Sequence, residues 1–181
     1  MARATGVAMV FQHFSLFEAL SVAENVALGM ENPPPMKALA ARIKSVSEDY
    51  GLPLDPARMV GDLSAGERQL ISFARALLHK PQILILDEAT SALGASAVEK
   101  VFTVIRKLRD EGCCILFISH RFHEVEALAD TITVFRAGQH VRTFPAGTID
   151  NQSIVSLMIG ETMDRLFPPP RSAVPASAAP L

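Results

Sequence analysis

Two adjacent carboxylates follow a short apolar segment in the middle of the chain. Residues 83–86 read Ile-Leu-Ile-Leu, and Asp87 and Glu88 come directly after them. This pattern predicts a strand buried on both faces, as in a parallel sheet covered by helices, and such sheets bind ligands at the carboxyl ends of their strands. In an extended segment the two acids point in opposite directions, so one can hold a hydrated Mg²⁺ while the other orients or deprotonates a water. The alternative is a strand end with two solvated acids.

A polar turn opens the helix that precedes this strand. Ser64 and Glu67 have the S-x-x-E spacing of a capping box, which predicts that Ser64 is the N-cap. A helix N-terminus presents N–H groups and a partial positive charge that suit a phosphate, and Gly66 has no side chain to block close approach. Taken alone, an ordinary capped helix is the simpler interpretation.

In their order and spacing these segments resemble the ATPase domain of ABC transporters. Residues 63–69, Leu-Ser-Ala-Gly-Glu-Arg-Gln, are similar to the family signature Leu-Ser-Gly-Gly-Gln, and residues 83–88 are similar to the Walker B strand with its catalytic glutamate. The resemblance implies an α/β, P-loop NTPase-like fold with a mostly parallel sheet flanked by helices. It also implies a helical subdomain at about residues 20–80 inside a partial ATPase domain of residues 1–167. Residues 168–181 are rich in proline and alanine and are expected to be a disordered tail or linker remnant.

Three further segments resemble motifs of the same family. The segment that ends at Gln12 is similar to the Q-loop, and His120, directly after a predicted strand, is similar to the histidine of the H-loop. Residues 89–94 are similar to the D-loop but depart from it at Gly94, where the family commonly has Asp. Without this context Gln12 is a polar residue after a strand, and His120 is a surface histidine. We expect no zinc site at His120 and His123, because no third ligand is in view.

The resemblance implies a role for each matching position. Asp87 and Gln12 would organise Mg²⁺, and Gln12 would also sense the γ-phosphate of ATP. Glu88 would be the general base on water, with His120 in support. The signature residues that would close over ATP bound to the opposite domain are Ser64, Ala65, Gly66 and Glu67.

The activity implied by the resemblance is ATP hydrolysis that powers an ABC importer. Residues 12–26 and 157–161 look most like importers of simple sugars or nucleosides. The implied partners are a second ATPase domain (as a homodimer or a tandem half), transmembrane permease subunits and, indirectly, a solute-binding protein, with the chain on the cytoplasmic face of the membrane. Two alternatives stay open: a non-catalytic remnant that docks on a transporter partner, and a soluble ABC ATPase that acts on ribosomes or DNA. The net charge of −2 argues against a nucleic-acid partner.

The 181 residues contain no G-x-x-x-x-G-K-[S/T] phosphate loop, and the chain begins 11 residues before Gln12. We therefore expect a piece that is N-terminally truncated relative to the family, without Walker A and the first strands. The missing part is expected to include a neighbour of the strand at residues 83–86. Its loss would uncover apolar core and leave the chain marginally stable or prone to aggregation.

The composition is that of one globular domain, with 49% hydrophobic and 20% charged residues. Cys113 and Cys114 are adjacent in a predicted buried strand at residues 113–118. Their side chains should point to opposite faces, so we expect two buried thiols and no bridge between them.

Overall fold

The computed structural model describes residues 6–12 and 15–160, so the tail predicted at residues 168–181 lies outside the described part. The contacts divide the chain into two compact units, Met1–Leu128 and Ala129–Leu181. The domain boundaries expected from the sequence stay a prediction.

In chain order the elements are β1 (Val7–Val10), α1 (Val22–Leu28), α2 (Met36–Asp49), the 3-10 helix η2 (Val60–Asp62), α3 (Ala65–Leu77), β2 (Ile83–Asp87), α4 (Ala95–Asp110), β3 (Cys114–Ile118), α5 (Phe122–Leu128), β4 (Thr131–Arg136), β5 (Gln139–Pro145) and α6 (Asn151–Ile159).

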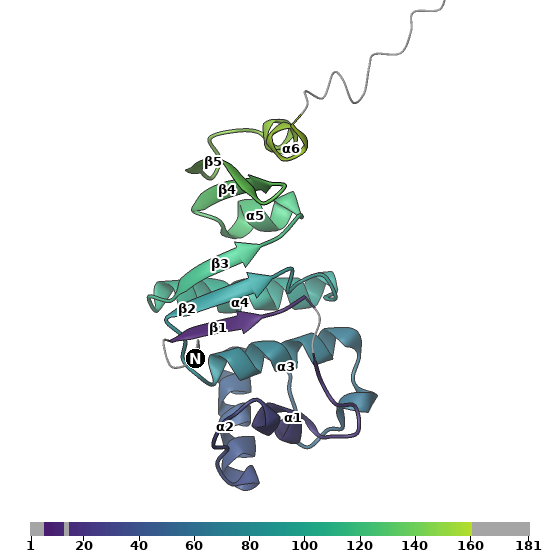
Figure 1. The fold of residues 1–181 in the computed structure, drawn as a ribbon. Helices are drawn as coiled ribbons and strands as arrows, with labels where there is room; N and C mark the ends of the chain where they lie inside the picture. The colour runs from purple at the N-terminus through teal and green to yellow at the C-terminus, as the bar shows by residue number, and fades with distance from the viewer. Residues whose placement is uncertain (1–5, 13–14, 161–181) are drawn as a thin grey trace, which may run out of the picture. The chain divides into compact units, whose positions relative to one another are not determined.

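The first unit is built on a parallel sheet of three strands in the order β1-β2-β3, as Figure 1 shows. Ile85 in the middle strand pairs with Met9 on one side and with Leu116 on the other. The predicted parallel sheet is confirmed. The expectation that β2 lacks a neighbouring strand is wrong, because the segment just before Gln12 itself supplies β1. Within the described residues the edge strands of this sheet are β1 and β3, and β2 is paired on both sides.

The two faces of this sheet are covered unequally. Leu84 and Leu86 are fully buried in a cluster that includes residues of α3 and α4, whereas Ile83 is 39% exposed and Leu116 is 53% exposed. Alternate residues of a strand point to opposite faces, so one whole face of the sheet is less covered than the other. The prediction that β2 is buried on both faces is therefore wrong, and so is the prediction that β3 is a buried strand.

This uneven cover leads to a prediction about self-association. Leu116→Thr should reduce concentration-dependent light scattering of the purified chain and change the free energy of unfolding by no more than about 0.5 kcal/mol, because an exposed apolar strand at a sheet edge promotes association. The matched control is Leu84→Thr on the buried face, which should destabilise the chain by about 2–5 kcal/mol. Equal scattering by wild type and Leu116→Thr would contradict the prediction.

The helices between β1 and β2 include the one that carries the signature residues. Helix α3 contacts β1, and α1 and α2 pack against α3 on its other side (Figure 1). The predicted capping box at Ser64 before α3 is confirmed, and a second capping box lies at Ser21 before α1. In each box the serine side chain accepts a hydrogen bond from the backbone of a glutamate three residues on, so each helix begins at a defined residue.

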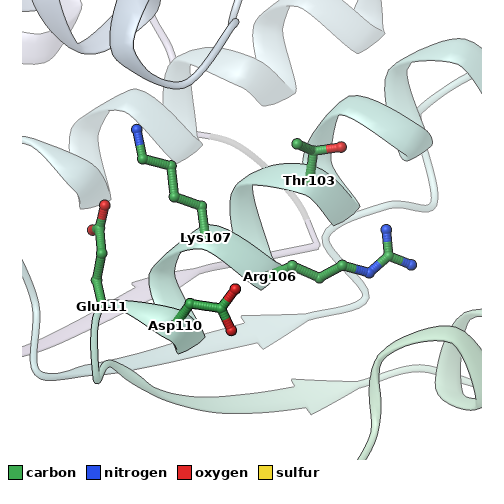
Figure 2. A pocket seen from close by; sticks show the side chains of 5 residues that line it. All are labelled: Thr103, Arg106, Lys107, Asp110 and Glu111. Atoms are coloured by element: carbon green, nitrogen blue, oxygen red, sulfur yellow. The ribbon is translucent and has the colours of Figure 1, made fainter.

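Helix α4 lies on the well-covered face of the sheet, with its apolar stripe buried and its polar face outward. Figure 2 shows that polar face, where a shallow hollow of about 470 Å³ is lined by Thr103, Arg106, Lys107, Asp110 and Glu111. Each charged side chain there already has a partner within the protein. Arg106 Nη2 donates a hydrogen bond to Ala127 O, and Lys107 Nζ donates one to Asp49 O. Glu111 Oε2 accepts a hydrogen bond from Tyr50 Oη, and Asp110 forms an ion pair with Arg109. We therefore do not take this hollow as the functional site.

The two cysteines are free thiols with different surroundings. Cys113 is buried and Cys114 is exposed. The absence of a bridge between them is as predicted, but the predicted burial of Cys114 is wrong, because its side chain lies on the less covered face of the sheet. Burial raises the pKa of the Cys113 thiol above its ordinary value.

The second unit is a hairpin covered by one helix. Strands β4 and β5 are antiparallel, and Ala137 and Gly138 between them both have positive φ, at 49° and 75°, as a tight hairpin turn requires. Helix α6 packs on the hairpin and ends at Gly160, whose φ of 87° is left-handed. Among the described residues, no helix of either unit has the length and apolar character needed to cross a bilayer.

Candidate functional site

Three polar side chains meet where the three parallel strands end. Gln12 follows β1, Glu88 follows β2 and His120 follows β3. Gln12 Nε2 donates a hydrogen bond to Glu88 Oε2 at 2.9 Å, and His120 Nδ1 lies 3.1 Å from Glu88 Oε1. The carboxyl ends of parallel strands share one edge of a sheet. Gln12 and His120, which are 76 and 32 positions from Glu88 in the sequence, therefore become its neighbours in space. The structure thus brings together the three residues predicted as catalytic.

The backbone at Glu88 departs from the sequence-based expectation. Strand β2 ends at Asp87, and Glu88 has a φ of 44°, in the left-handed region that side chains other than glycine seldom adopt. The expectation that Asp87 and Glu88 alternate on an extended segment is therefore wrong. The Glu88 N–H donates to Ile118 O at 3.0 Å, which holds the turn against the end of β3. Such a backbone costs about 1–3 kcal/mol and is common at active sites.

The carboxylate of Glu88 is accessible rather than enclosed. Its side chain is 29% exposed, and that of His120 is 62% exposed. Asp87 and Gln12 both line a cavity of about 770 Å³ beside the less covered face of the sheet, with Met9 and Ile85 on its wall. A ligand in this cavity would lie beside Asp87 and Gln12, and the side chain of Glu88 is partly open to solvent.

The donor set at this edge fits Mg²⁺ only in part. Asp87 offers a carboxylate. Gln12 offers its amide oxygen, because its amide N–H group donates a hydrogen bond to Glu88. These are hard oxygen ligands of the kind that Mg²⁺ prefers. No group of three or more His, Cys, Asp or Glu side chains in the described residues could hold a metal ion. A Mg²⁺ ion here would therefore complete its coordination with water and with phosphate oxygens.

The predicted signature residues lie at the N-terminus of α3, where Ser64 is exposed. Ser64 N donates to Glu67 Oε2 at 2.9 Å, and Arg58 Nη1 lies 2.7 Å from Glu67 Oε1. The hydrogen bonds from the Ser64 backbone and hydroxyl, together with that from Arg58, hold the pKa of Glu67 below its ordinary value. Glu67 is thus engaged by its own chain as a cap, and the exposed groups of this turn are Ser64 and Ala65.

Gly66 lies close to the turn that follows β2. A Cβ added to Gly66 would meet Ala92 O and Leu93 Cδ2, both at 3.7 Å, which is ordinary van der Waals contact. Within the described residues, no hydrogen bond joins residues 64–67 to Gln12, Glu88 or His120. The structure therefore shows two separate clusters, one at the strand ends and one at the start of α3.

One buried residue that the sequence did not single out links these two clusters. Gln69 of α3 is fully buried, and its Nε2 donates to Phe11 O at 3.2 Å, directly before Gln12. Its Oε1 has no hydrogen-bond partner among the described residues. The sequence could have indicated this residue, because a polar Gln69 falls on the apolar face of the helix with Leu70 and Phe73. A buried amide costs free energy unless it is paired, so such a position indicates a specific contact.

Comparison with known proteins identifies the family. Residues 2–91, about half of the chain, match the family model described as ABC transporter. The fold is that of an ATP-binding cassette, a P-loop NTPase-like α/β domain. The chain belongs to the ABC transporter ATP-binding proteins, as the resemblance of its motifs predicts.

Several curated relatives are named as ATP-binding proteins of sugar import. The chain is 43% identical over 175 residues to ribose import ATP-binding protein RbsA 1 of Rhizobium johnstonii, covering 93% of this chain and 34% of that protein. It is 42% identical to RbsA 1 of Mesorhizobium japonicum, covering 99% and 36%, and 36% identical to arabinose import ATP-binding protein AraG of Vibrio parahaemolyticus, covering 90% and 33%. The chain thus spans about a third of the length of these relatives.

Solved structures support the fold at lower identity. The ADP conformation of MJ1267, an ATP-binding cassette of an ABC transporter, superimposes with a TM-score of 0.71 at 21% identity, over 88% of this chain and 70% of that chain. The post-hydrolysis dimer of the cassette MJ0796 with ADP and phosphate gives a TM-score of 0.68 at 22% identity, over 79% and 64%.

Proposed function

We propose that this chain is part of an ATP-hydrolysing subunit that powers an importer of simple sugars, of the ribose or arabinose class. The observation that carries the proposal is the contact of Gln12 and His120 with the two carboxylate oxygens of Glu88. The names of the sugar-import relatives support the substrate class. An orienting amide, a carboxylate and an imidazole at one accessible edge are the groups that attack of water on a phosphate requires.

Glu88 is the general base in this proposal. One carboxylate oxygen receives the proton of the attacking water, while Gln12 and His120 restrict the rotation of the carboxylate by contacting both oxygens. Asp87, at the end of β2, and the amide oxygen of Gln12 would hold the water shell of Mg²⁺. Mg²⁺, when bound, would neutralise charge on the phosphates of ATP.

The signature turn serves the opposite nucleotide in this proposal. Ser64 is exposed at the start of α3, where the free N–H groups and partial positive charge of the first turn suit a γ-phosphate. The relevant unit is then a pair of ATPase domains, either two copies or two halves of one chain, and the solved cassette MJ0796 is itself dimeric. The assembly that we propose also contains permease subunits and a solute-binding protein that acts through them. It lies at the cytoplasmic face of the membrane.

Replacement of His120 tests the proposal. In the longest in-frame gene product that contains these 181 residues (below, the full gene product), His120→Ala should lower ATP hydrolysis by about tenfold or more, because Glu88 loses one of its two orienting contacts. His123→Ala is the matched control, since His123 is exposed three residues away on α5 and should leave the rate unchanged. A colorimetric phosphate assay measures both. Equal rates for the two variants would count against a catalytic role of His120.

A non-catalytic partner is the second candidate, because the sequence contains no phosphate loop of the Walker A type. In that case the chain would contribute only its signature turn to a complete ATPase domain. Titration of the 181-residue chain into a complete sugar-import ATPase would then change the rate of that enzyme without any hydrolysis by the chain alone. Salt-sensitive binding to RNA or DNA would instead favour a soluble, non-transport ABC ATPase.

A further inference from the structure

A buried carboxylate connects the turns that follow β2 and β3. Glu124 of α5 is 0% exposed, and its Oε2 accepts hydrogen bonds from Thr90 Oγ1 and Ser119 Oγ, both at 2.8 Å. Arg121 Nη1 lies 3.3 Å from Glu124 Oε1. The buried negative charge thus has two hydroxyl donors and one cation within reach, as a buried charge needs.

These partners are neighbours of the residues that we place at the site. Thr90 is two residues after Glu88, and Ser119 is directly before His120. Arg121 Nη2 also donates to Ser91 O at 3.3 Å, and Arg121 N donates to Ser119 Oγ at 3.0 Å. The network therefore joins the two turns through side chains as well as backbone.

We propose that Glu124 is a positioning residue for ATP hydrolysis, which fixes the separation of Glu88 and His120 by tying together the turns that carry them. The inference rests on the proposed function. The turn at Glu88 needs such support because its left-handed backbone is strained and persists only when the surroundings hold it. Glu124 itself touches no reacting atom, since it is enclosed beneath the turns.

The alternative is that Glu124 only adds stability to unit 1. The two cases differ in where the effect of a substitution appears. A positioning residue changes the geometry at residues 89–93 and 119–121 and lowers kcat. It has little effect on the KM for ATP, because the enclosed side chain of Glu124 cannot touch a bound ligand. A purely stabilising residue changes the free energy of unfolding and leaves the kcat of the folded protein unchanged.

Two near-isosteric variants separate these cases. Glu124→Gln keeps the shape of the side chain but removes the charge and one acceptor oxygen. Thr90→Val removes a single donor from the network and keeps the β-branched shape, so it remains informative if Glu124→Gln fails to fold. Glu99→Gln on the exposed face of α4 is the control, and Glu124→Asp tests rescue by a shorter acid.

The first readout is kinetic, on the full gene product. Both Glu124→Gln and Thr90→Val should lower kcat by about ten- to a hundredfold, because misplacement of catalytic groups by about 1 Å has effects of that size, while the KM for ATP changes by less than about threefold. Glu124→Asp should recover part of the rate, and Glu99→Gln should match wild type. Unchanged kcat in both Glu124→Gln and Thr90→Val would overturn the inference.

The second readout is hydrogen exchange, which does not depend on hydrolysis. Amides of residues 89–93 and 119–121 should exchange at least about threefold faster in both variants, while amides of α1 and α2 keep their wild-type rates. An even increase across unit 1 would show a purely stabilising role and overturn the inference. If the wild type hydrolyses no ATP, the proposed function fails, and hydrogen exchange alone decides whether Glu124 couples the two turns.

Discussion

Glu88→Gln in the full gene product should reduce the rate of ATP hydrolysis by about 10²–10⁴-fold, the range that a general base contributes. The amide keeps the size of the side chain and can still contact Gln12 and His120, but it cannot accept a proton from water. ATP binding should therefore persist, and the bound, unhydrolysed nucleotide should hold two ATPase domains together. Single-turnover hydrolysis and size-exclusion chromatography with Mg²⁺ and ATP measure the two effects.

The matched control for this variant is Glu99→Gln, which removes one exposed carboxylate on α4 and should leave hydrolysis unchanged. Hydrolysis by wild type that Glu88→Gln abolishes would refute the view that the chain is a non-catalytic remnant. Hydrolysis that survives Glu88→Gln within about threefold of wild type would refute the role of Glu88 as general base, because loss of a base has a larger effect.

Phe73→Ala should destabilise the chain by about 3–5 kcal/mol, the usual cost of removing a fully buried aromatic ring. Phe73 is fully buried on α3 and belongs to the same apolar cluster as Val10, Leu84 and Leu86. It therefore attaches the signature helix to the sheet that carries Gln12 and Glu88. A whole domain is stable by only about 5–15 kcal/mol, so this one change should leave a large unfolded fraction.

Chemical denaturation followed by circular dichroism checks this expectation. The control is Phe73→Leu, which refills much of the volume with apolar atoms and should cost less than the alanine variant. A loss below about 1 kcal/mol for Phe73→Ala would show that α3 is not held to the sheet through this side chain.

Local sequence patterns predicted those parts of the structure that local physics decides. Ser64 was identified as a cap from a spacing of three residues, and a capping box is formed within one helical turn. The convergence of Gln12, Glu88 and His120 followed from the family resemblance and from the rule that parallel strands end at one edge.

The incorrect or missing expectations concern contacts between distant segments. An apolar run such as residues 83–86 has the same pattern whether one face or both are covered, so burial on both faces could not be told from the sequence. Glu124 looks like any acid on a short helix, and its burial depends on Thr90 and Ser119 from other segments. The left-handed backbone of Glu88 is likewise set by the hydrogen bond to Ile118 O, which no local pattern encodes.

The unusual backbone at position 88 limits which amino acids can serve there. Glycine, asparagine and aspartate adopt this conformation most easily, but glycine has no carboxylate, and the side chains of asparagine and aspartate are one methylene shorter. Glutamate contacts Gln12, which follows β1, and His120, which follows β3, with one oxygen for each. Glutamate at this position therefore costs backbone strain but has a side chain long enough to contact both partners. A protein selected for stability alone would carry a different residue at this turn.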